Sequence, residues 1–151
     1  MNKLNNLIVD LNTSQILVGL DLGTKTIGVS VSDTSKIIAT PLTTIKRKGT
    51  KKDLSKLKEV LNDYEIGGFI LGLPINLDNS ENKQSQLVRN FNEELKIFFK
   101  LPSVFWDERF SSDIIYKELR KSQMSKNKIK KKLDQQSASY ILQGYLNRYS
   151  N

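Results

Sequence analysis

The order in which extended and helical patterns follow one another constrains this fold more than any other feature of the chain. Residues 16–21, 27–32 and 37–45 are predicted to be three consecutive strands joined by short links. The first is an apolar run that ends in an acid, and the second alternates with the period of a strand that has one buried face. Pro41 places the third strand near an edge or a bulge. Three such strands in a row predict an antiparallel meander.

After these strands the pattern changes to an alternation of helices and strands. Leucines at helical spacing predict a helix that opens with a capping box formed by Thr50 and Asp53. The continuous apolar run 68–73 is typical of a strand covered on both faces. A second helix is expected to open at Ser80, and residues 104–106 are expected to form the last strand.

Two helices are expected to close the chain. The first is marked by Ile114, Ile115 and Leu119, and the second, with the most regular apolar stripe, is expected to start at Asp134. This order predicts an α/β fold with a mixed five-stranded sheet, in which three antiparallel strands are followed by two parallel ones and helices lie on both faces.

The domain organisation is expected to be simple. We predict a loosely ordered arm over residues 1–15 and one domain over residues 16–151. The longest uncharged apolar stretch, residues 68–75, is far shorter than the roughly 20 residues of a membrane helix, so no membrane association is expected.

Composition narrows the chemistry that this chain can perform. It contains no Cys and no His, which excludes disulfides, thiolate nucleophiles and imidazole bases. Any reaction must therefore use carboxylates, Lys, Arg, hydroxyls, backbone dipoles or a hard cation. The 24 Lys and Arg against 16 Asp and Glu give a net charge of +8, which favours a polyanionic partner. The absence of Cys also fits a cytoplasmic location.

Acidic residues stand where predicted strands end and the last helix begins. Asp21 ends the first strand, Asp107 and Glu108 end the last strand, and Asp134 starts the last helix. Ligands of open α/β sheets bind beyond the carboxyl ends of the strands, so we expect these acids to meet. Crowded carboxylates need a cation, and ligands that are all oxygen suit Mg²⁺ or Mn²⁺. Such ions support phosphodiester hydrolysis without His or Cys.

Each acid also has a purely structural interpretation. Asp21 can shape the turn that follows it. Asp107 and Glu108 can form a surface ion pair with Arg109, and Asp134 can be only the N-cap of its helix. Strand alternation puts Asp107 and Glu108 on opposite faces, so only one of them is expected at the metal.

Two segments that follow strands are candidates for holding a phosphate. The first is a turn that lacks the glycine spacing of a P-loop and consists of Gly23, Thr24, Lys25 and Thr26. The second is the segment 72–76, which would bring Asn76 near the site. Its alternative interpretation is a tight strand-to-helix connection.

Basic residues are clustered in two places. One stretch without any acid contains Arg120, Lys121, Lys126, Lys128, Lys130, Lys131 and Lys132. A second cluster consists of Lys46, Arg47, Lys48, Lys51 and Lys52. Such clusters neutralise phosphates in a salt-sensitive manner. The alternative interpretation for both is a solvated, flexible loop.

Four motifs in order resemble the YqgF-type, RuvX-like proteins of the RNase H-like superfamily. They are residues 16–33, residues 72–78, residues 107–112, and Leu133–Asp134 followed by Ala138 and Ile141–Leu142. This resemblance covers about residues 16–149 and implies an RNase H-like sheet and metal-dependent cleavage of phosphodiester bonds in a bacterial cytoplasm. The implied reaction is 5′-end maturation of pre-16S ribosomal RNA or resolution of Holliday junctions.

The resemblance also implies roles for particular residues. The family's acidic positions fall on Asp21, on the Asp107–Glu108 pair and on Asp134, while Asn79 stands where the family commonly has Gly. We hypothesise a nuclease in which these acids hold Mg²⁺ or Mn²⁺. Arg109 would orient the carboxylates or contact the strand, and the 120–132 segment would bind the nucleic acid backbone as a loop.

The expected partners are precursor ribosomal RNA or branched DNA, together with ribosomal particles, and the protein is expected to be a monomer or a homodimer. Two alternatives remain. One is a non-catalytic RNA-binding factor in ribosome assembly. The other is an actin-like or sugar-kinase-like phosphotransferase, which the length disfavours because such enzymes close two domains around ATP.

Overall fold

The computed structural model describes residues 6–109 and 120–149, without the side chains of residues 130–135. Its centre is a mixed sheet of five strands in the order β3-β2-β1-β4-β5. The strands are β1 (Ile16–Leu22), β2 (Thr26–Ser32), β3 (Ala39–Lys46), β4 (Ile66–Leu73) and β5 (Ser103–Asp107). The first three pair antiparallel, whereas β4 and β5 run parallel to β1. The predicted fold class is therefore confirmed.

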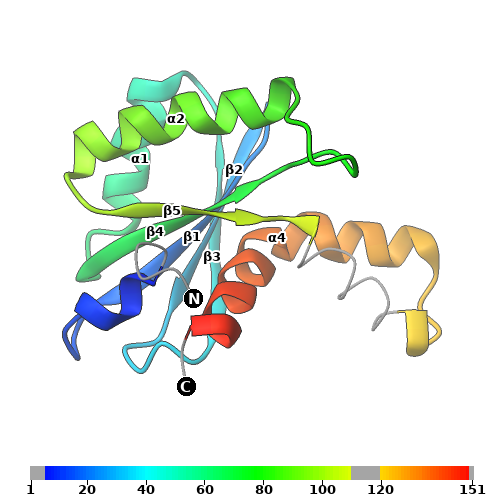
Figure 1. The fold of residues 1–151 in the computed structure, drawn as a ribbon, viewed down its shortest axis with the longest axis horizontal. Coiled ribbons are helices and arrows are strands. Elements are labelled where there is room, and N and C mark those ends of the chain that lie inside the picture. The colour runs from blue at the N-terminus through cyan, green and yellow to red at the C-terminus, as the bar shows by residue number, and fades with distance from the viewer. Residues whose placement is uncertain (1–5, 110–119, 150–151) are drawn as a thin grey trace.

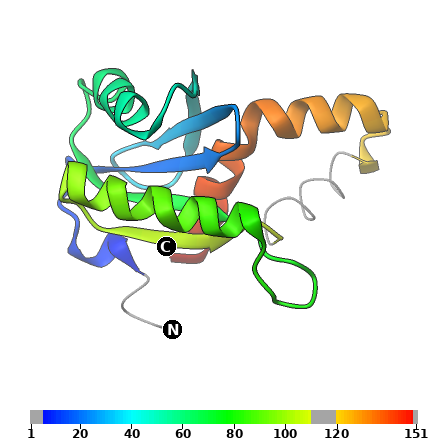
Figure 2. The same ribbon diagram turned by 90° about the horizontal axis from the view of Figure 1, so that it is seen from above.

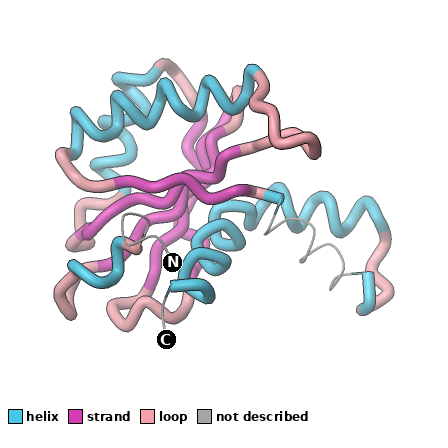
Figure 3. Tube along the Cα trace, in the orientation of Figure 1, coloured by secondary structure: helices cyan, strands magenta, loops and turns pink. Residues whose placement is uncertain are grey.

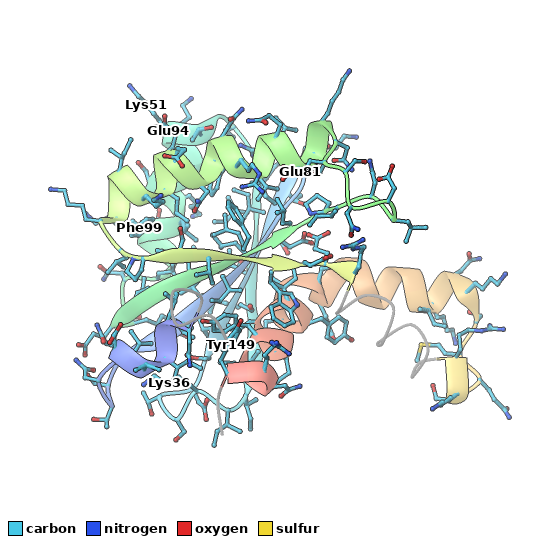
Figure 4. All side chains as sticks on the ribbon, viewed as in Figure 1. Lys36, Lys51, Glu81, Glu94, Phe99 and Tyr149 are labelled. Carbon is cyan, nitrogen blue, oxygen red and sulfur yellow. The ribbon has the colours of Figure 1, made fainter. Side chains whose placement is uncertain are left out.

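Helices cover both faces of this sheet. Helices α1 (Thr50–Val60) and α2 (Lys83–Phe99) lie on one face, and α4 (Lys126–Tyr149) lies on the other (Figure 1). The strands cross between the two helical layers, as the colouring in Figure 3 shows. Phe99 of α2 and Tyr149 of α4 lie on opposite sides of the sheet (Figure 4).

Strand alternation divides the core into two clusters. Val18 and Leu20 of β1 belong to the cluster beneath α1 and α2, whereas Leu17 packs with Leu142 and Tyr145 of α4. Burial of each large apolar side chain stabilises the fold by roughly 1.5–3 kcal/mol. Gly19 allows α4 to approach β1 closely, because a Cβ at this position would lie 2.7 Å from the Cβ of Leu142.

The edge strand β3 has the irregularity that Pro41 predicted. The β2–β3 register shifts between Val29 and Ser30, and Pro41 pairs with Ser30 just beyond the shift. Proline has no N–H to donate, so it is tolerated at an edge or a bulge. Pro41 lies on an edge strand and also next to a register shift.

The N-terminal segment differs from the loosely ordered arm that we expected. Residues 7–10 form a short 3-10 helix, and the side chain of Leu7 is buried. The backbone N–H of Leu7 donates a hydrogen bond of 2.8 Å to the hydroxyl of Tyr145. Residues 6–15 are therefore docked on the domain, while residues 1–5 lie outside the described part of the chain.

Two predicted helix starts are wrong by a few residues. Helix α1 has Gly49 as its N-cap without a side-chain cap, and the carboxylate of Asp53 accepts from the backbone N–H of Lys48 instead. Before α2, Ser80 hydrogen-bonds to the carboxylate of Asp78 in a local turn. The capping box belongs to Asn82 and Ser85.

The start of the last helix is the largest correction. Helix α4 begins at Lys126, and the Oγ of Ser125 caps it by accepting from the backbone N–H of Lys128 at 3.3 Å. Asp134 therefore lies inside the helix, so its interpretation as an N-cap is wrong. The lysines of residues 126–132 form helical turns rather than a loop. The expected helix around Ile114 lies outside the described residues.

None of the helices in the described part of the chain has the length and apolar character that a membrane crossing requires.

Candidate active site

Asp21 projects from the middle strand of the sheet toward α4. Its neighbours in β1, Leu20 and Leu22, point to the opposite face and are buried there. Across the antiparallel pair, Asp21 faces Gly28, and Ala138 of α4 lies beside that glycine. A carboxylate is thereby half-buried between the sheet and the last helix.

Glu108 reaches the same place from the end of β5. Its backbone N–H donates to the carbonyl of Leu73 at 3.3 Å, which fixes the chain just after the strand. Gly72 makes room for its side chain, because a Cβ at residue 72 would lie 2.5 Å from Oε1 of Glu108 and 2.5 Å from Cδ1 of Ile141. The carboxyl groups of Glu108 and Asp21 share a hydrogen bond.

The environment of this pair perturbs its ionisation. Burial of its side chain raises the pKa of Glu108 from 4.5 to about 7. The charge of Asp21, the hydrogen bond between Glu108 and Asp21, and the charge of Asp107 add to this increase. Two carboxyl groups in contact share a proton, and both ionise only when a cation lies between them. The pair brings together two of the four acids that the sequence predicted for this site.

The donor set fits a hard divalent cation. Both ligating groups are carboxylates, and oxygen ligands suit Mg²⁺ or Mn²⁺. Within the described residues no group of three or more His, Cys, Asp or Glu comes together. Asp134 lies in α4 one turn before Ala138, but its side chain is outside the described part of the structure. Its predicted role at the metal stays a prediction.

Asp107 makes contacts that differ from those of its neighbour Glu108. The guanidinium of Arg109 donates to both of its carboxylate oxygens, with Nε at 3.0 Å from each and Nη2 at 2.6 Å from Oδ2. These hydrogen bonds hold the pKa of Asp107 below its usual value. Both carboxylate oxygens of Asp107 are thus bonded to Arg109. This is the ion pair that the sequence analysis gave as the structural interpretation of Asp107.

Arg109 also fixes the loop that follows β4. Its Nη1 donates to the carbonyl of Asn76 at 3.0 Å, and its Nη2 donates to the side chain of Asn79 at 3.1 Å. Asn79 has a φ of +70°, a conformation that Gly and Asn adopt more readily than other residues. The Asn at this position is therefore compatible with the backbone conformation of the loop.

The amide of Asn76 is occupied within its own loop. Its Nδ2 donates to Oγ of Ser80, and its Oδ1 accepts from Nδ2 of Asn82, both at 2.9 Å. Asn76 holds the turn together, in line with the tight strand-to-helix connection considered above. In both views this loop and the first half of α4 extend past the same end of the sheet (Figures 1 and 2).

The turn between β1 and β2 is also braced from within. The N–H of Gly23 donates to the carbonyl of Thr26 at 2.8 Å, and the carbonyl of Lys25 accepts from the N–H of Arg47 at 2.9 Å. The backbone amide of Gly23 is therefore engaged inside the turn. The side chains of Thr24 and Lys25 are exposed at the same end of the sheet as Asp21.

The predicted basic segment flanks the site from α4. Lys126 and Lys128 are exposed in the first turn of the helix, whereas the side chains of Lys130, Lys131 and Lys132 lie outside the described part of the structure. Arg120 and Lys121 are exposed just before the helix begins.

A polar hollow beside Asp21 was missed by the sequence analysis. It has a volume of about 140 Å³, and five of its twelve lining residues carry a hydroxyl group, among them Thr26 of β2. Thr43 and Thr44 come from β3, and Ser137 and Ser139 come from α4. The available signal was the run of threonines on the edge strand, which is too polar for a core and faces the acids across the sheet.

Comparisons with known proteins were made for the whole chain. A family model described as "RuvX: Holliday junction resolvase" matches residues 15–148. A protein of Rhodobacter capsulatus named "Putative pre-16S rRNA nuclease" is 44% identical over 135 residues, which are 89% of this chain and 85% of that protein. A protein of Thermoanaerobacter pseudethanolicus with the same name is 43% identical over 136 residues, which are 89% of this chain and 98% of that protein.

Among solved structures, T. thermophilus RuvC in complex with a Holliday junction substrate matches with a TM-score of 0.48 and 13% identity, over 67% of this chain and 69% of that one.

Proposed function

The chain belongs to the RuvX family, and from this premise we propose that it is a hydrolase that cleaves phosphodiester bonds of nucleic acid at the Asp21–Glu108 pair. The observation that carries the proposal is the hydrogen bond between these two half-buried carboxyl groups. A divalent cation stabilises the ionised form of such a pair, because it replaces the shared proton and relieves the repulsion between the two carboxylates.

We propose that Asp21 and Glu108 bind Mg²⁺ or Mn²⁺ and that Asp134 of α4 completes the ligand set. The chemistry that such an ion supplies is a lowered pKa for a bound water and neutralisation of charge on the leaving oxygen. Glu108 is the ligand from the β5 end, because Asp107 already pairs with Arg109.

The surrounding residues position the substrate. Arg109 and Asp107 together hold the 74–82 loop beside the carboxylates, so that the loop forms one wall of the site. Lys25 and the lysines at the start of α4 contact the phosphates on either side of the scissile bond. The polar hollow next to Asp21 receives part of the nucleotide at that bond.

We propose precursor 16S ribosomal RNA as the first substrate, in the bacterial cytoplasm and in the context of ribosomal particles. This choice follows the names of relatives that are 43–44% identical to the chain. Trimming an RNA end requires one copy of the protein, whereas a symmetric cut of a four-way junction requires a two-fold dimer. We therefore propose that the protein acts on RNA as a monomer.

The test is a cleavage assay with two end-labelled substrates, precursor 16S RNA and a four-way DNA junction, in Mg²⁺, Mn²⁺ or EDTA. The wild type should cleave only with the divalent cation, and Asp21→Asn and Glu108→Gln should each abolish cleavage while leaving binding nearly intact. Asp63→Asn is the matched control, because Asp63 is exposed just before β4 at the opposite end of the sheet. Metal-independent cleavage, or full activity of Asp21→Asn, contradicts the proposal. Binding without cleavage in every condition favours the assembly factor.

A further inference from the structure

A second, larger hollow lies between the end of β3 and helix α1. Its volume is about 550 Å³, and five lysines line it: Lys46, Lys48, Lys51, Lys52 and Lys56. Four of them belong to the second basic cluster of the sequence, which the proposed active site does not use. Lys51 lies in the first turn of α1, and its side chain is exposed (Figure 4).

The charge of this hollow is poorly compensated by the protein itself. The carboxylate of Asp53 is buried and committed to Nε of Arg47 at 3.1 Å and to the N–H of Lys48 at 2.8 Å. Glu59 makes a weak, exposed pair with Lys56 at 3.5 Å. The other four lysines form no ion pair with any described residue. A concave surface with one sign of charge concentrates counter-ions.

The backbone beside the lysines leaves space for a ligand. Gly49 has a φ of +121°, which favours glycine, and no atom lies within 4 Å of the position that a Cβ would occupy. A phosphate can therefore approach the main chain closely at the start of α1.

The hollow lies at the same end of the sheet as the carboxylates. In the strand register, Asp21 pairs with Gly28, and Gly28 pairs with Thr44. Two strand spacings separate Asp21 from Thr44, which corresponds to about 10 Å. Thr44 lines both the lysine hollow and the polar hollow beside Asp21. Because β3 is the edge strand, no further strand of the sheet stands between the two hollows at this residue.

We propose that the lysine hollow binds the phosphate backbone of the same single strand that is cut at Asp21, a few nucleotides from the scissile bond. This inference rests on the proposed function and assigns the strand a path around the end of β3. The continuity at Thr44 selects nucleic acid as the ligand, since a polyanion in one hollow leads directly into the other. Contacts between lysines and phosphates do not distinguish one base from another, so the lysine hollow adds affinity for RNA without adding sequence specificity.

The experiment compares Lys51→Gln/Lys52→Gln with Lys58→Gln/Lys100→Gln. Both double variants remove two exposed lysines, and Lys58 lies on the same helix but outside the hollow. Binding is measured in an Asp21→Asn background with labelled single-stranded RNAs of about 4 and about 16 nucleotides, a range typical of single-strand sites.

We expect the first variant to weaken binding of the longer RNA about tenfold at low salt. It should also reduce the slope of log affinity against log salt by about 1.4, the value for two phosphate contacts on a single strand. The short RNA and the control variant should show neither change. With Asp21 restored, the apparent KM should rise while kcat stays constant, since the lysines do not touch the reacting atoms.

Equal affinity of the two variants for the longer RNA overturns the inference, and so does an equal loss for both RNA lengths. Cleavage by the wild type is scored separately. If the wild type cleaves and the lysine variant binds normally, only this inference fails. If no substrate is cleaved but binding still depends on Lys51 and Lys52, the proposed function fails and the binding site is supported.

Discussion

The burial of Glu108 and its contact with Asp21 make the stability of the metal-free protein depend on pH in a particular direction. In the unfolded chain Glu108 ionises with a pKa near 4.5, whereas in the folded protein the pKa is about 7. The folded state therefore binds more protons over this interval, so the free energy of unfolding falls as pH rises from 4.5 to about 7. At about 1.36 kcal/mol for each unit of pKa, the loss is about 3 kcal/mol.

The perturbation is Glu108→Gln, measured by thermal unfolding in EDTA. The amide donates a hydrogen bond to Asp21 as the protonated acid does, but it never ionises. Above the folded-state pKa the variant should be about 3 kcal/mol more stable than the wild type, and below pH 4.5 the two should be equal. For a domain of this size that corresponds to a difference in Tm of roughly 6–12 °C.

A divalent cation should nearly cancel this difference. Mg²⁺ binds only the folded wild type and, at about 100 times its Kd, raises stability by about 2.7 kcal/mol. The variant should gain much less. Glu94→Gln, at an exposed position of α2, should change stability by less than about 0.5 kcal/mol at either pH. A variant no more stable than the wild type above pH 7 in EDTA would refute this reasoning, because the pair would then impose no penalty on ionisation.

Three further changes have distinct expected outcomes. Gly72→Ala should reduce cleavage at least about tenfold and destabilise the fold by about 1–3 kcal/mol, because its Cβ would displace the Glu108 carboxylate; Gly67→Ala, whose Cβ meets only a leucine side chain, should leave kcat unchanged in the same assay. Tyr145→Phe should lower the free energy of unfolding in urea by about 1–2 kcal/mol, since a buried backbone N–H of the N-terminal 3-10 helix loses its acceptor. Arg109→Lys should increase amide hydrogen exchange in the loop after β4 about tenfold, because lysine lacks the planar fork that bonds the carboxylate and the loop together; unchanged exchange would show that the loop is fixed by other contacts.

The sheet could be predicted from sequence because each strand has a strong local signal. Continuous burial in residues 68–73 corresponds to a strand covered on both faces. The second strand was correctly predicted as a strand, but the expectation of one buried face was wrong, because α4 packs on its other face and buries Ser30 there. Pro41 indicated an edge or a bulge, and the structure has both.

The start of α4 could not be predicted because its first turns have little apolar periodicity. Ile129 is fully buried, but lysines surround it in the sequence, so the apolar stripe becomes visible only from Ala138 onward. Lysine is a good helix former, and the cap at Ser125 starts the helix there. Charge clustering suggested a loop, whereas helix propensity and tertiary burial determined the structure.

The sequence also could not show which of Asp107 and Glu108 points toward the candidate site. Alternation places neighbouring residues on opposite faces only within a strand, and β5 ends at Asp107. The direction of Glu108 is set by the turn after the strand and by the room that Gly72 leaves. Asp107 is directed elsewhere by Arg109, whose other partners lie about thirty residues earlier in the chain.

The docking of the N-terminal 3-10 helix on α4 has a consequence for biosynthesis. The bond between Leu7 and Tyr145 joins residues 138 positions apart, and α4 packs on the face on which Leu17 and Ile70 lie. A nascent chain leaves the ribosome from its N-terminus, so this face stays open until α4 has been synthesised. The Asp21–Glu108 pair lies on the same face, against Ile141. Assembly of the proposed cleavage site is thereby delayed until α4 has emerged, and we expect chains that stop before α4 to lack a finished site.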